Sequence, residues 1–264
     1  MSRMRQSGRF DPCVPRDSQI TTLARDYAAG HVVPLHFHDR DQIVYASGGV
    51  MTVRTNEGAW VVPTHRAVWI PAKVSHTITM SGRVAMRTLY LTPRLAGALP
   101  RSCCVLNISP LIRELILHAC TLHGLNRRKE VQRHLIEVIV DQLESVPTVS
   151  LNLPNPTDPR ALRVTKLLFA NPADNRTLAE ICRVAGTGKR TMERRFQDET
   201  GMTRGRWRQQ LRLMQGMHLL AEGAKVTHAA LESGYSSPSA FISMFRKCWG
   251  TTPSRCFEAQ PRHK

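Results

Sequence analysis

The sequence predicts a two-domain protein of mixed α and β structure. Its 264 residues suit two domains of about 100–150 residues each. Short runs rich in Val, Ile, Thr and Tyr fill residues 20–92, apolar positions recur at helical spacing from residue 110, and residues 160–257 repeat one helical pattern twice. These three observations favour an N-terminal β-barrel with a helical hairpin, followed by an all-α domain that contains two helix-turn-helix motifs.

The composition narrows the class of partner. Lys and Arg number 37 against 20 Asp and Glu, a formal net charge of +17, and 42% of the residues are hydrophobic. That hydrophobic share is enough for a globular core, and no apolar run reaches the roughly 20 residues of a membrane span. No secretory signal is visible, and the seven Cys form no Cys-x-x-Cys pair, so we expect a reducing cytoplasm. The basic surplus predicts an anionic partner, either nucleic acid or an anionic membrane surface.

The first domain is expected to be a β-barrel that follows a basic arm, residues 1–19. Residues 20–100 hold several short β-rich runs, and turn residues such as Gly48, Gly49 and Pro71 interrupt them. Many short strands with regular turn signals are typical of a barrel or a sandwich.

A helical hairpin is expected next, over residues 101–146, with its turn near residues 124–126. The positions that recur at helical spacing are Leu111, Leu115, His118, Leu122, Val131, Leu135, Val138 and Leu143. Such a hairpin either covers the barrel or forms the contact of a homodimer.

A proline-rich linker should separate the two domains over residues 147–159. Each proline lacks an N–H group and restricts the residue before it, so the stretch cannot sustain a helix or a central strand. Beyond it, residues 160–264 carry 19 Lys or Arg and 8 Asp or Glu, a net charge of +11. The basic surplus is therefore concentrated in the C-terminal domain, where a nucleic-acid surface is expected.

The C-terminal domain contains an internal repeat. Its copies span residues 178–199 and 226–249, and Phe196 and Phe245 are 49 positions apart, as are Gly201 and Gly250. Each copy has a short helix, a glycine turn and a second helix whose aromatic residues recur on one face, which is the pattern of a helix-turn-helix motif. The second helix of such a motif presents its first turns to the bases of DNA.

A long helix over residues 203–222 should join the two motifs. At 1.5 Å per residue it would span roughly 30 Å, close to the roughly 34 Å between successive major grooves on one side of DNA. Arg204, Arg206, Arg208 and Arg212 on this helix would meet phosphates. The candidate DNA contacts are Thr187, Lys189, Arg190, Thr191, Arg194, Arg195, Arg204, Arg206, Ser237, Ser239, Ser243, Arg246 and Lys247.

These residues resemble the AraC/XylS family of bacterial transcription regulators. The resemblance rests on Leu178, Ile181, Gly186, Thr191, Met192, Arg194, Phe196 and Gly201, and on Ala230, Gly234, Tyr235, Ser237, Pro238, Ser239, Phe241, Phe245, Arg246, Gly250, Thr252 and Pro253. It covers about residues 160–257 and leaves a tail, residues 258–264. The chain departs from the family at Cys256 and Phe257, where Tyr and Arg are usual. The resemblance implies sequence-specific binding of double-stranded DNA, and the first motif, richer in cations, should supply more of the affinity.

The N-terminal domain contains a group of histidines with the spacing of cupin motifs. Gly30-x5-His36-x-His38-x3-Gln42-x6-Gly49 resembles the first motif, with Gln in place of Glu, and Pro71-x-Lys73-x2-His76 resembles the second, with Lys in place of Gly. The resemblance implies a cupin-like barrel. His36, His38 and His76 could then converge with Gln42, either around a divalent metal ion or as hydrogen-bonding residues of an effector pocket that requires no cofactor.

The favoured function is therefore a cytoplasmic transcriptional regulator, an activator or a repressor, that binds DNA and responds to a small effector through its cupin domain. As an activator it would contact RNA polymerase. The alternative is a cupin-type metal-dependent enzyme whose basic C-terminal domain only localises it on nucleic acid. Gln42 in place of an acidic ligand counts against the enzyme. A membrane binder would need a Lys-rich amphipathic helix that the sequence lacks.

Overall fold

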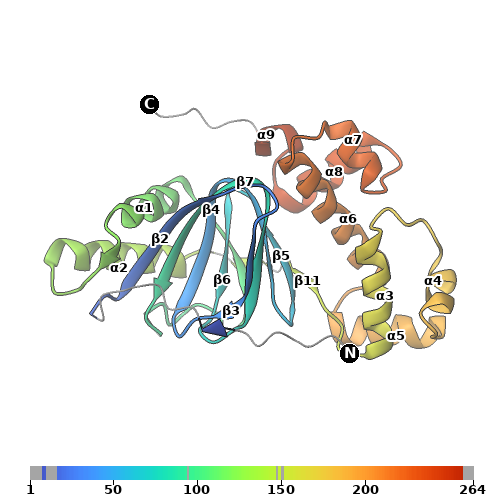
Figure 1. The fold of residues 1–264 in the computed structure, drawn as a ribbon, viewed down its shortest axis with the longest axis horizontal. Helices are drawn as coiled ribbons and strands as arrows, with labels where there is room; N and C mark the ends of the chain where they lie inside the picture. The colour runs from blue at the N-terminus through green and yellow to red at the C-terminus, as the bar shows by residue number, and fades with distance from the viewer. Residues whose placement is uncertain (1–7, 10–16, 94, 147, 150–151, 258–264) are drawn as a thin grey trace. The chain divides into compact units, whose positions relative to one another are not determined.

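The computed structural model describes residues 8–9, 17–93, 95–146, 148–149 and 152–257 (Figure 1). The chain forms two compact units. The first unit comprises Met1–Asn56 with Trp60–Asn152, and the second comprises Glu57–Ala59 with Leu153–Lys264. Within the described residues, no helix combines the length and the apolar character that crossing a bilayer requires.

A largely antiparallel sheet forms the first unit. Its strands are β1 (Gly8–Arg9), β2 (Ile20–Tyr27), β3 (Val32–Phe37), β4 (Asp41–Arg54), β5 (Gly58–Val62), β6 (Arg66–Ile70), β7 (His76–Leu91) and β8 (Cys104–Asn107), with the short β9 (Gly124–Leu125) and β10 (Thr148–Val149). Strand β7 pairs with β2, β3 and β4, and β6 lies between β4 and β8. In Figure 1 the long strands β4 and β7 run through the middle of this sheet.

The two faces of the sheet bury different apolar clusters because successive side chains point to opposite sides. On β4, Ile43 and Tyr45 join a cluster with the helices, whereas Val44 and Ala46 belong to a second cluster between the strands. The glycine pair after Ala46 bends β4 at a bulge. Gly49 adopts a φ of +80°, and a Cβ atom there would collide with the Arg83 carbonyl group. Glycine is therefore required at this bend.

Helices α1 (Pro110–Thr121) and α2 (Glu130–Glu144) lie on one side of the sheet (Figure 1). Ser109 caps α1 by accepting a hydrogen bond from the Ile112 N–H group. The expected apolar positions of this hairpin are confirmed only in part, because Leu143 is buried and Leu115 and Leu135 pack against the core. The helices bury Ile112, Ile116, Ala119, Cys120, Ile136, Ile139 and Leu143, whereas Leu111, Leu122, Val131 and Val138 are exposed.

The buried side of α1 differs from the expected side because both sides of this helix are apolar. Only the packing against the sheet decides which side is buried. The boundary of the hairpin also needs correction. Residues 104–107 form β8, which pairs with β6 and β10, so the helical part begins only at residue 110.

The second unit contains the helices α3 (Pro159–Ala170), α4 (Leu178–Val184), α5 (Lys189–Thr200), α6 (Arg204–Ala221), α7 (Val226–Glu232), α8 (Pro238–Trp249) and α9 (Pro253–Phe257). Local chemistry accounts for several of their ends. Thr177 and Glu180 form a capping box at α4, and Thr203 caps α6. Gly186 and Gly234, both with positive φ, follow α4 and α7.

The expected linker is partly structured. Residues 148–149 form β10 and pair with β8, and β11 (Asn152–Pro154) pairs with β5. Both strands are short, which is compatible with prolines because edge positions leave N–H groups unused. Residues 147, 150 and 151 of the linker, most of the expected arm and the expected tail lie outside the described residues.

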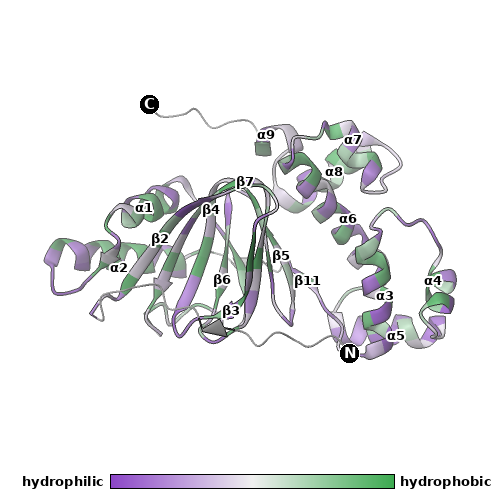
Figure 2. Cartoon of the chain, in the orientation of Figure 1, coloured by the Kyte–Doolittle hydropathy of each residue, from purple (hydrophilic) through white to green (hydrophobic). Residues whose placement is uncertain are grey.

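Trp207 of α6 forms the centre of the packing around the first helix pair. Its side chain is fully buried, and the edges of Phe169 and Phe196 meet it at ring-centroid distances of 5.4 and 5.6 Å. The indole N–H donates to the carbonyl of Pro154 at 2.8 Å, so the one polar atom of this ring is satisfied. In Figure 2 the sheet strands carry long hydrophobic stretches, whereas α5 is largely hydrophilic.

Candidate nucleic-acid interface and effector pocket

Helix α5 exposes a cationic side opposite its buried side. Met192 and Phe196 are buried, while Lys189, Arg190 and Arg194 are exposed. Lys189 and Arg190 occupy the first turn, where the positive end of the helix dipole disfavours cations by about 0.3–1 kcal/mol each. A polyanion bound there would relieve this repulsion.

The remaining candidates near α5 are placed differently. Thr187 precedes the helix and Thr191 is half-buried beside the exposed cations. Arg195 is 3.4 Å from the carboxylate of Asp158, which caps α3. Glu199, one turn further on, accepts hydrogen bonds from the backbone N–H groups of residues 157 and 158, and these bonds lower its pKa. The Arg195 side of α5 therefore holds α3, which argues against Arg195 as a base contact.

Helix α8 presents hydroxyl groups in its first half. Ser239 and Ser243 are exposed, whereas the hydroxyl of Ser237 caps the helix by accepting a hydrogen bond from the Ala240 N–H group. Arg246 and Lys247 are exposed in the last turn. Cations are favoured there by the helix dipole, so a structural role accounts for them as well as DNA contact does.

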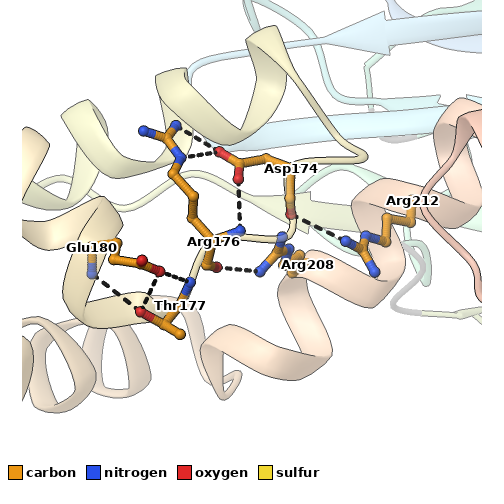
Figure 3. A network of polar contacts seen from close by, with 6 residues as sticks. All are labelled: Asp174, Arg176, Thr177, Glu180, Arg208 and Arg212. Atoms are coloured by element: carbon orange, nitrogen blue, oxygen red, sulfur yellow. Dashed lines mark hydrogen bonds and ion pairs between the residues drawn. The ribbon is translucent and has the colours of Figure 1, made fainter.

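The four arginines of α6 do not share one role. Arg206 is exposed and Arg204 is half-buried. Arg208 donates to the carbonyl of Arg176 at 3.1 Å (Figure 3). Arg212 donates to backbone carbonyls of two separate turns, at Pro172 and at Gly234. Burial lowers the pKa of both of these guanidinium groups. The expectation that Arg208 and Arg212 meet phosphates is therefore wrong, because their donors are directed into the protein.

The turn before α4 is held by a buried carboxylate. Asp174 accepts hydrogen bonds from Arg176 Nε at 2.9 Å and Arg176 Nη2 at 2.6 Å, and from the Arg176 backbone N–H group (Figure 3). The side-chain bonds from Arg176 lower the pKa of Asp174. The carboxylate therefore stays ionised. Its Oδ2 atom accepts from both side-chain nitrogens of Arg176, and its Oδ1 atom accepts from the backbone N–H group of the same residue.

In the first unit, the structure brings the three predicted histidines together. The ring centroids of His36 and His38 are 4.8 Å apart, those of His36 and His76 are 4.3 Å apart, and those of His38 and His76 are 5.4 Å apart. One nitrogen from each ring lies within 4.8 Å of the others, and all three side chains are buried. His36 and His76 face each other because they are register partners on β3 and β7.

Hydrogen bonds fix the tautomers of two of these rings. Nδ1 of His36 lies 2.7 Å from the Pro34 carbonyl and Nδ1 of His76 lies 2.9 Å from the Val74 carbonyl. A carbonyl accepts only, so each Nδ1 carries the proton and each Nε2 carries a lone pair. Burial lowers the pKa of His36 and lowers that of His76 to about 3. Both rings are therefore neutral at pH 7.

Two buried acceptors lie on β4 and β7, which pair with each other. The Nε2 atom of His76 and the Oε1 atom of Gln42 are buried and have no hydrogen-bond partner among the described residues. His76 is 0% exposed and Gln42 is 1% exposed. Because a buried acceptor without a donor is costly, this arrangement suits a cation or a ligand that donates hydrogen bonds.

A cavity of about 310 Å³ adjoins the cluster. The residues of its lining that carry polar groups are Arg25, Tyr27, His31, His36, Gln42 and Tyr90. The apolar part of the lining comes from Leu23, Val33, Pro34, Ile78 and Met86. Sequence reasoning missed the residues of β2. Leu23, Arg25 and Tyr27 follow one another at intervals of two, which places them on one face of a strand and could have identified them. A cavity that combines apolar walls with polar groups at defined positions is the usual form of a small-molecule site.

Lys73 occupies the position where the second cupin motif usually has Gly. The structure gives it a φ of +68°, in the left-handed region that favours glycine. Its backbone N–H donates to the His38 carbonyl at 2.7 Å, which ties the turn before His76 to the strand end that carries His38.

Comparison with known proteins identifies both halves of the chain. The AraC-like ligand binding domain matches residues 20–150, and a helix-turn-helix domain matches residues 181–259. The chain is 34% identical to the HTH-type transcriptional regulator NimR of Escherichia coli K12, over 84% of this chain and 81% of NimR. It is 33% identical to the HTH-type transcriptional regulator RipA of Corynebacterium glutamicum, over 42% of this chain and 32% of RipA.

Among solved structures, the chain is similar to ToxT from Vibrio cholerae, crystallised with an unsaturated fatty acid. The identity is 11%, the alignment covers 92% of this chain and 97% of ToxT, and the TM-score is 0.39.

Proposed function

Because the chain belongs to the AraC family of transcriptional regulators, we propose that it reads DNA through two helix-turn-helix motifs and responds to a small effector in a cupin-like barrel. The motifs are α4 with α5 and α7 with α8. The exposed cationic side of α5 is the observation that carries the proposal, because like charges at the positive end of a helix favour an anionic partner. The protein acts in the cytoplasm and catalyses no reaction.

The proposed DNA surface has two kinds of contact. Lys189, Arg190 and Arg194 on α5, together with Ser239 and Ser243 on α8, face base edges. Thr187 and Thr191 support the first group, and Ser237, Arg204, Arg206, Arg246 and Lys247 flank the surface. Arg195 is left out because it pairs with Asp158. The 18 residues of α6 span roughly 27 Å, close to the spacing of adjacent major grooves.

Selection of bound sequences from random DNA tests this surface. Replacing Arg190 or Arg194 by Ala should weaken binding to the selected site by about 1–3 kcal/mol each and relax the selected sequence at one position. Replacing the exposed Arg206 by Ala should weaken selected and unrelated DNA alike and flatten the salt dependence. Unchanged selection with the Arg190 and Arg194 replacements combined would contradict the assignment of α5.

We propose that the cavity beside the histidines holds the effector and that His36, His38 and His76 bind a divalent transition metal. The lone pairs on the Nε2 atoms of His36 and His76, and the unsatisfied Gln42 oxygen, fit a cation. A bound metal would supply Lewis acidity beside the cavity, because His36 belongs both to the cluster and to the cavity lining. Gln42 would orient or complete this set as a weak oxygen ligand.

Metal analysis of the purified full-length protein tests this site. We expect one equivalent of metal after dialysis against zinc, and its loss when His36 and His38 are replaced by Ala. His31 lines the same cavity outside the cluster, so its replacement by Ala is the control and should leave the metal content unchanged. Substoichiometric metal in the wild-type protein would contradict the metal site. The histidines would then act as hydrogen-bonding residues of the pocket.

The alternative of a cupin enzyme has less support. Neither the histidine cluster nor the lining of the adjoining cavity includes a carboxylate that could act as a general base. The proposal therefore assigns this site to sensing. Regulation that persists in a metal-free protein would exclude metal catalysis as its mechanism.

A homodimer through α1 and α2 is the proposed assembly. Leu111, Val131 and Val138 are exposed apolar residues on these helices, and Leu122 is another directly after α1. Val131 is 81% exposed. Sedimentation of the full-length protein should show a dimer that Leu111→Glu combined with Val138→Glu converts to a monomer. If the protein activates transcription, RNA polymerase is its further partner.

A further inference from the structure

Arg212 joins the two helix pairs of the DNA-binding domain through a single guanidinium group. Its Nε atom donates to the Pro172 carbonyl at 3.0 Å, and Nη2 donates to the Asp174 carbonyl at 3.1 Å and to Asn175 Oδ1 at 2.9 Å. Its Nη1 atom donates to the Gly234 carbonyl at 2.7 Å. The first three acceptors precede α4, and the last lies in the turn between α7 and α8.

The turn before α4 transmits this anchor to the first helix pair. Asp174 holds Arg176 by two side-chain hydrogen bonds, and Arg208 holds the Arg176 carbonyl (Figure 3). The next residue, Thr177, caps α4 in a box with Glu180. A shift of this turn relative to α6 would therefore displace the start of α4.

Close packing supports the contact on the side of the second pair. Gly234 has a φ of +85°, and a Cβ atom there would lie 2.8 Å from the Ala173 Cα atom and 2.9 Å from Arg212 Nε and Cζ. Gly186, the matching glycine of the first pair, has a φ of +67° and open space around it. The two turns thus share one backbone conformation, but only the turn at Gly234 is packed against Arg212 and the turn before α4.

We propose that Arg212, clamped between residues 172–175 and Gly234, fixes the distance and rotation between the two motifs and thereby sets the spacing of DNA half-sites that the protein accepts. The proposal rests on DNA reading by both motifs. A planar guanidinium can bond several carbonyls in fixed directions, whereas an ammonium cannot. Arg212 is a positioning residue: its donors are occupied within the protein, and it acts on DNA through the helices it holds.

The consequence for DNA follows from helix geometry. Each base pair inserted between two half-sites moves one of them by about 3.4 Å and rotates it by about 35°. A rigid pair of motifs should reject such sites, because binding both halves would require distortion. A loosened pair should tolerate them, yet bind the best site more weakly because its motifs are no longer pre-organised.

The experiment uses the full-length protein and the site selected by the wild type, with one or two base pairs inserted or deleted between its two protected segments. We expect Arg212→Lys to weaken binding at the natural spacing by about tenfold and to reduce the discrimination against altered spacings. Gly234→Ala should do the same. Gly186→Ala is the matched control, because it carries the same backbone strain without the contact, and it should keep the wild-type spacing profile.

The outcomes separate this proposal from a purely structural role. Loss of folded protein lowers the active fraction and leaves the spacing profile unchanged, so a wild-type profile in Arg212→Lys and Gly234→Ala would overturn the proposal. Equal profiles in Gly186→Ala and Gly234→Ala would do so too. If the wild-type protein protects a single segment and binds all spacings alike, the proposal that both motifs bind DNA is wrong, and with it the proposed role of Arg212.

Discussion

Replacing Gly216 by Ala tests the packing of α6 against the second helix pair. Gly216 is buried in the middle of α6, and a Cβ atom there would lie 2.5 Å from Phe241 Cε2, 2.7 Å from Phe241 Cζ and 3.1 Å from Ser233 Oγ. Phe241 is fully buried, and the rings of Tyr235 and Phe245 flank it at centroid distances of 5.3 and 5.7 Å. The ring therefore has little freedom to move aside.

Two opposing terms set the magnitude of this change. Ala in place of Gly stabilises a helix interior by about 0.8–1.0 kcal/mol. Inserting a methyl group into a packed core costs about 1–3 kcal/mol. Because the obstructing atoms belong to an enclosed ring, we expect the cost to win and the domain to lose about 1 kcal/mol.

Gly205 provides the matched control on the same helix. A Cβ atom at Gly205 would meet nothing within 4 Å, so Gly205→Ala should stabilise the domain by up to about 1 kcal/mol. Amide hydrogen exchange in increasing urea, followed on peptides from α6 to α8, measures the unfolding free energy of this domain separately from the other. Equal stabilisation by both replacements would refute the steric reasoning, because it would mean that Phe241 yields without cost.

Three further expectations concern charges and backbone strain. Asp174→Asn should destabilise the DNA-binding domain by about 1–2 kcal/mol. Since the pKa of Asp174 is lowered in the folded state, the carboxylate stabilises the domain above about pH 4, and this stabilisation disappears as the pH falls through the lowered pKa. Urea titrations of the variant should lack this pH dependence. Burial and the nearby Arg66 lower the pKa of His65 to about 4, so the first unit should lose up to about 1.4 kcal/mol per pH unit on acidification from pH 6.5 to 4, and His65→Gln should flatten this slope in acid-denaturation curves. Lys73→Gly should stabilise the first unit by about 0.5–1 kcal/mol, because glycine adopts the left-handed backbone without strain and this gain exceeds its larger entropy in the unfolded chain. A lowered unfolding midpoint would show instead that the Lys73 side chain holds the turn.

Local chemistry made much of the DNA-binding domain predictable. The expected helix over residues 203–222 coincides with α6 at Arg204–Ala221, because Thr203 caps its start and Gly223 follows its end. The repeat of 49 residues placed both helix pairs in the chain. The family and the regulatory function are confirmed by the relatives.

Packing partners that are distant in the sequence made the rest unpredictable. The buried side of α1 depends on the sheet, since Leu111 and Ile112 are equally apolar to a pattern count. The role of Arg212 depends on carbonyls 22 to 40 residues away, and that of Arg195 on Asp158. From the sequence alone, a cationic residue on a helix is interpreted as a phosphate contact, because its carbonyl or carboxylate partners elsewhere in the chain are not visible.

The candidate effector site was predictable in part for the same reason. Motif spacing identified His36, His38 and His76, which the structure brings together. The cavity beside them also needs Arg25 and Tyr27 from β2, and their contribution depends on how β2 pairs with β7.

Hydroxyl-radical footprinting of the full-length protein on its selected site tests the two-motif reading most directly. We expect two protected segments on one face of the duplex, their centres about one helical turn, or about 10 base pairs, apart. Arg190→Ala combined with Arg194→Ala should remove protection from one segment, and replacing Ser239 and Ser243 by bulky acidic residues should remove it from the other. A single protected segment, or two segments that both survive these replacements, would contradict the assignment of α5 and α8 as the helices that read DNA.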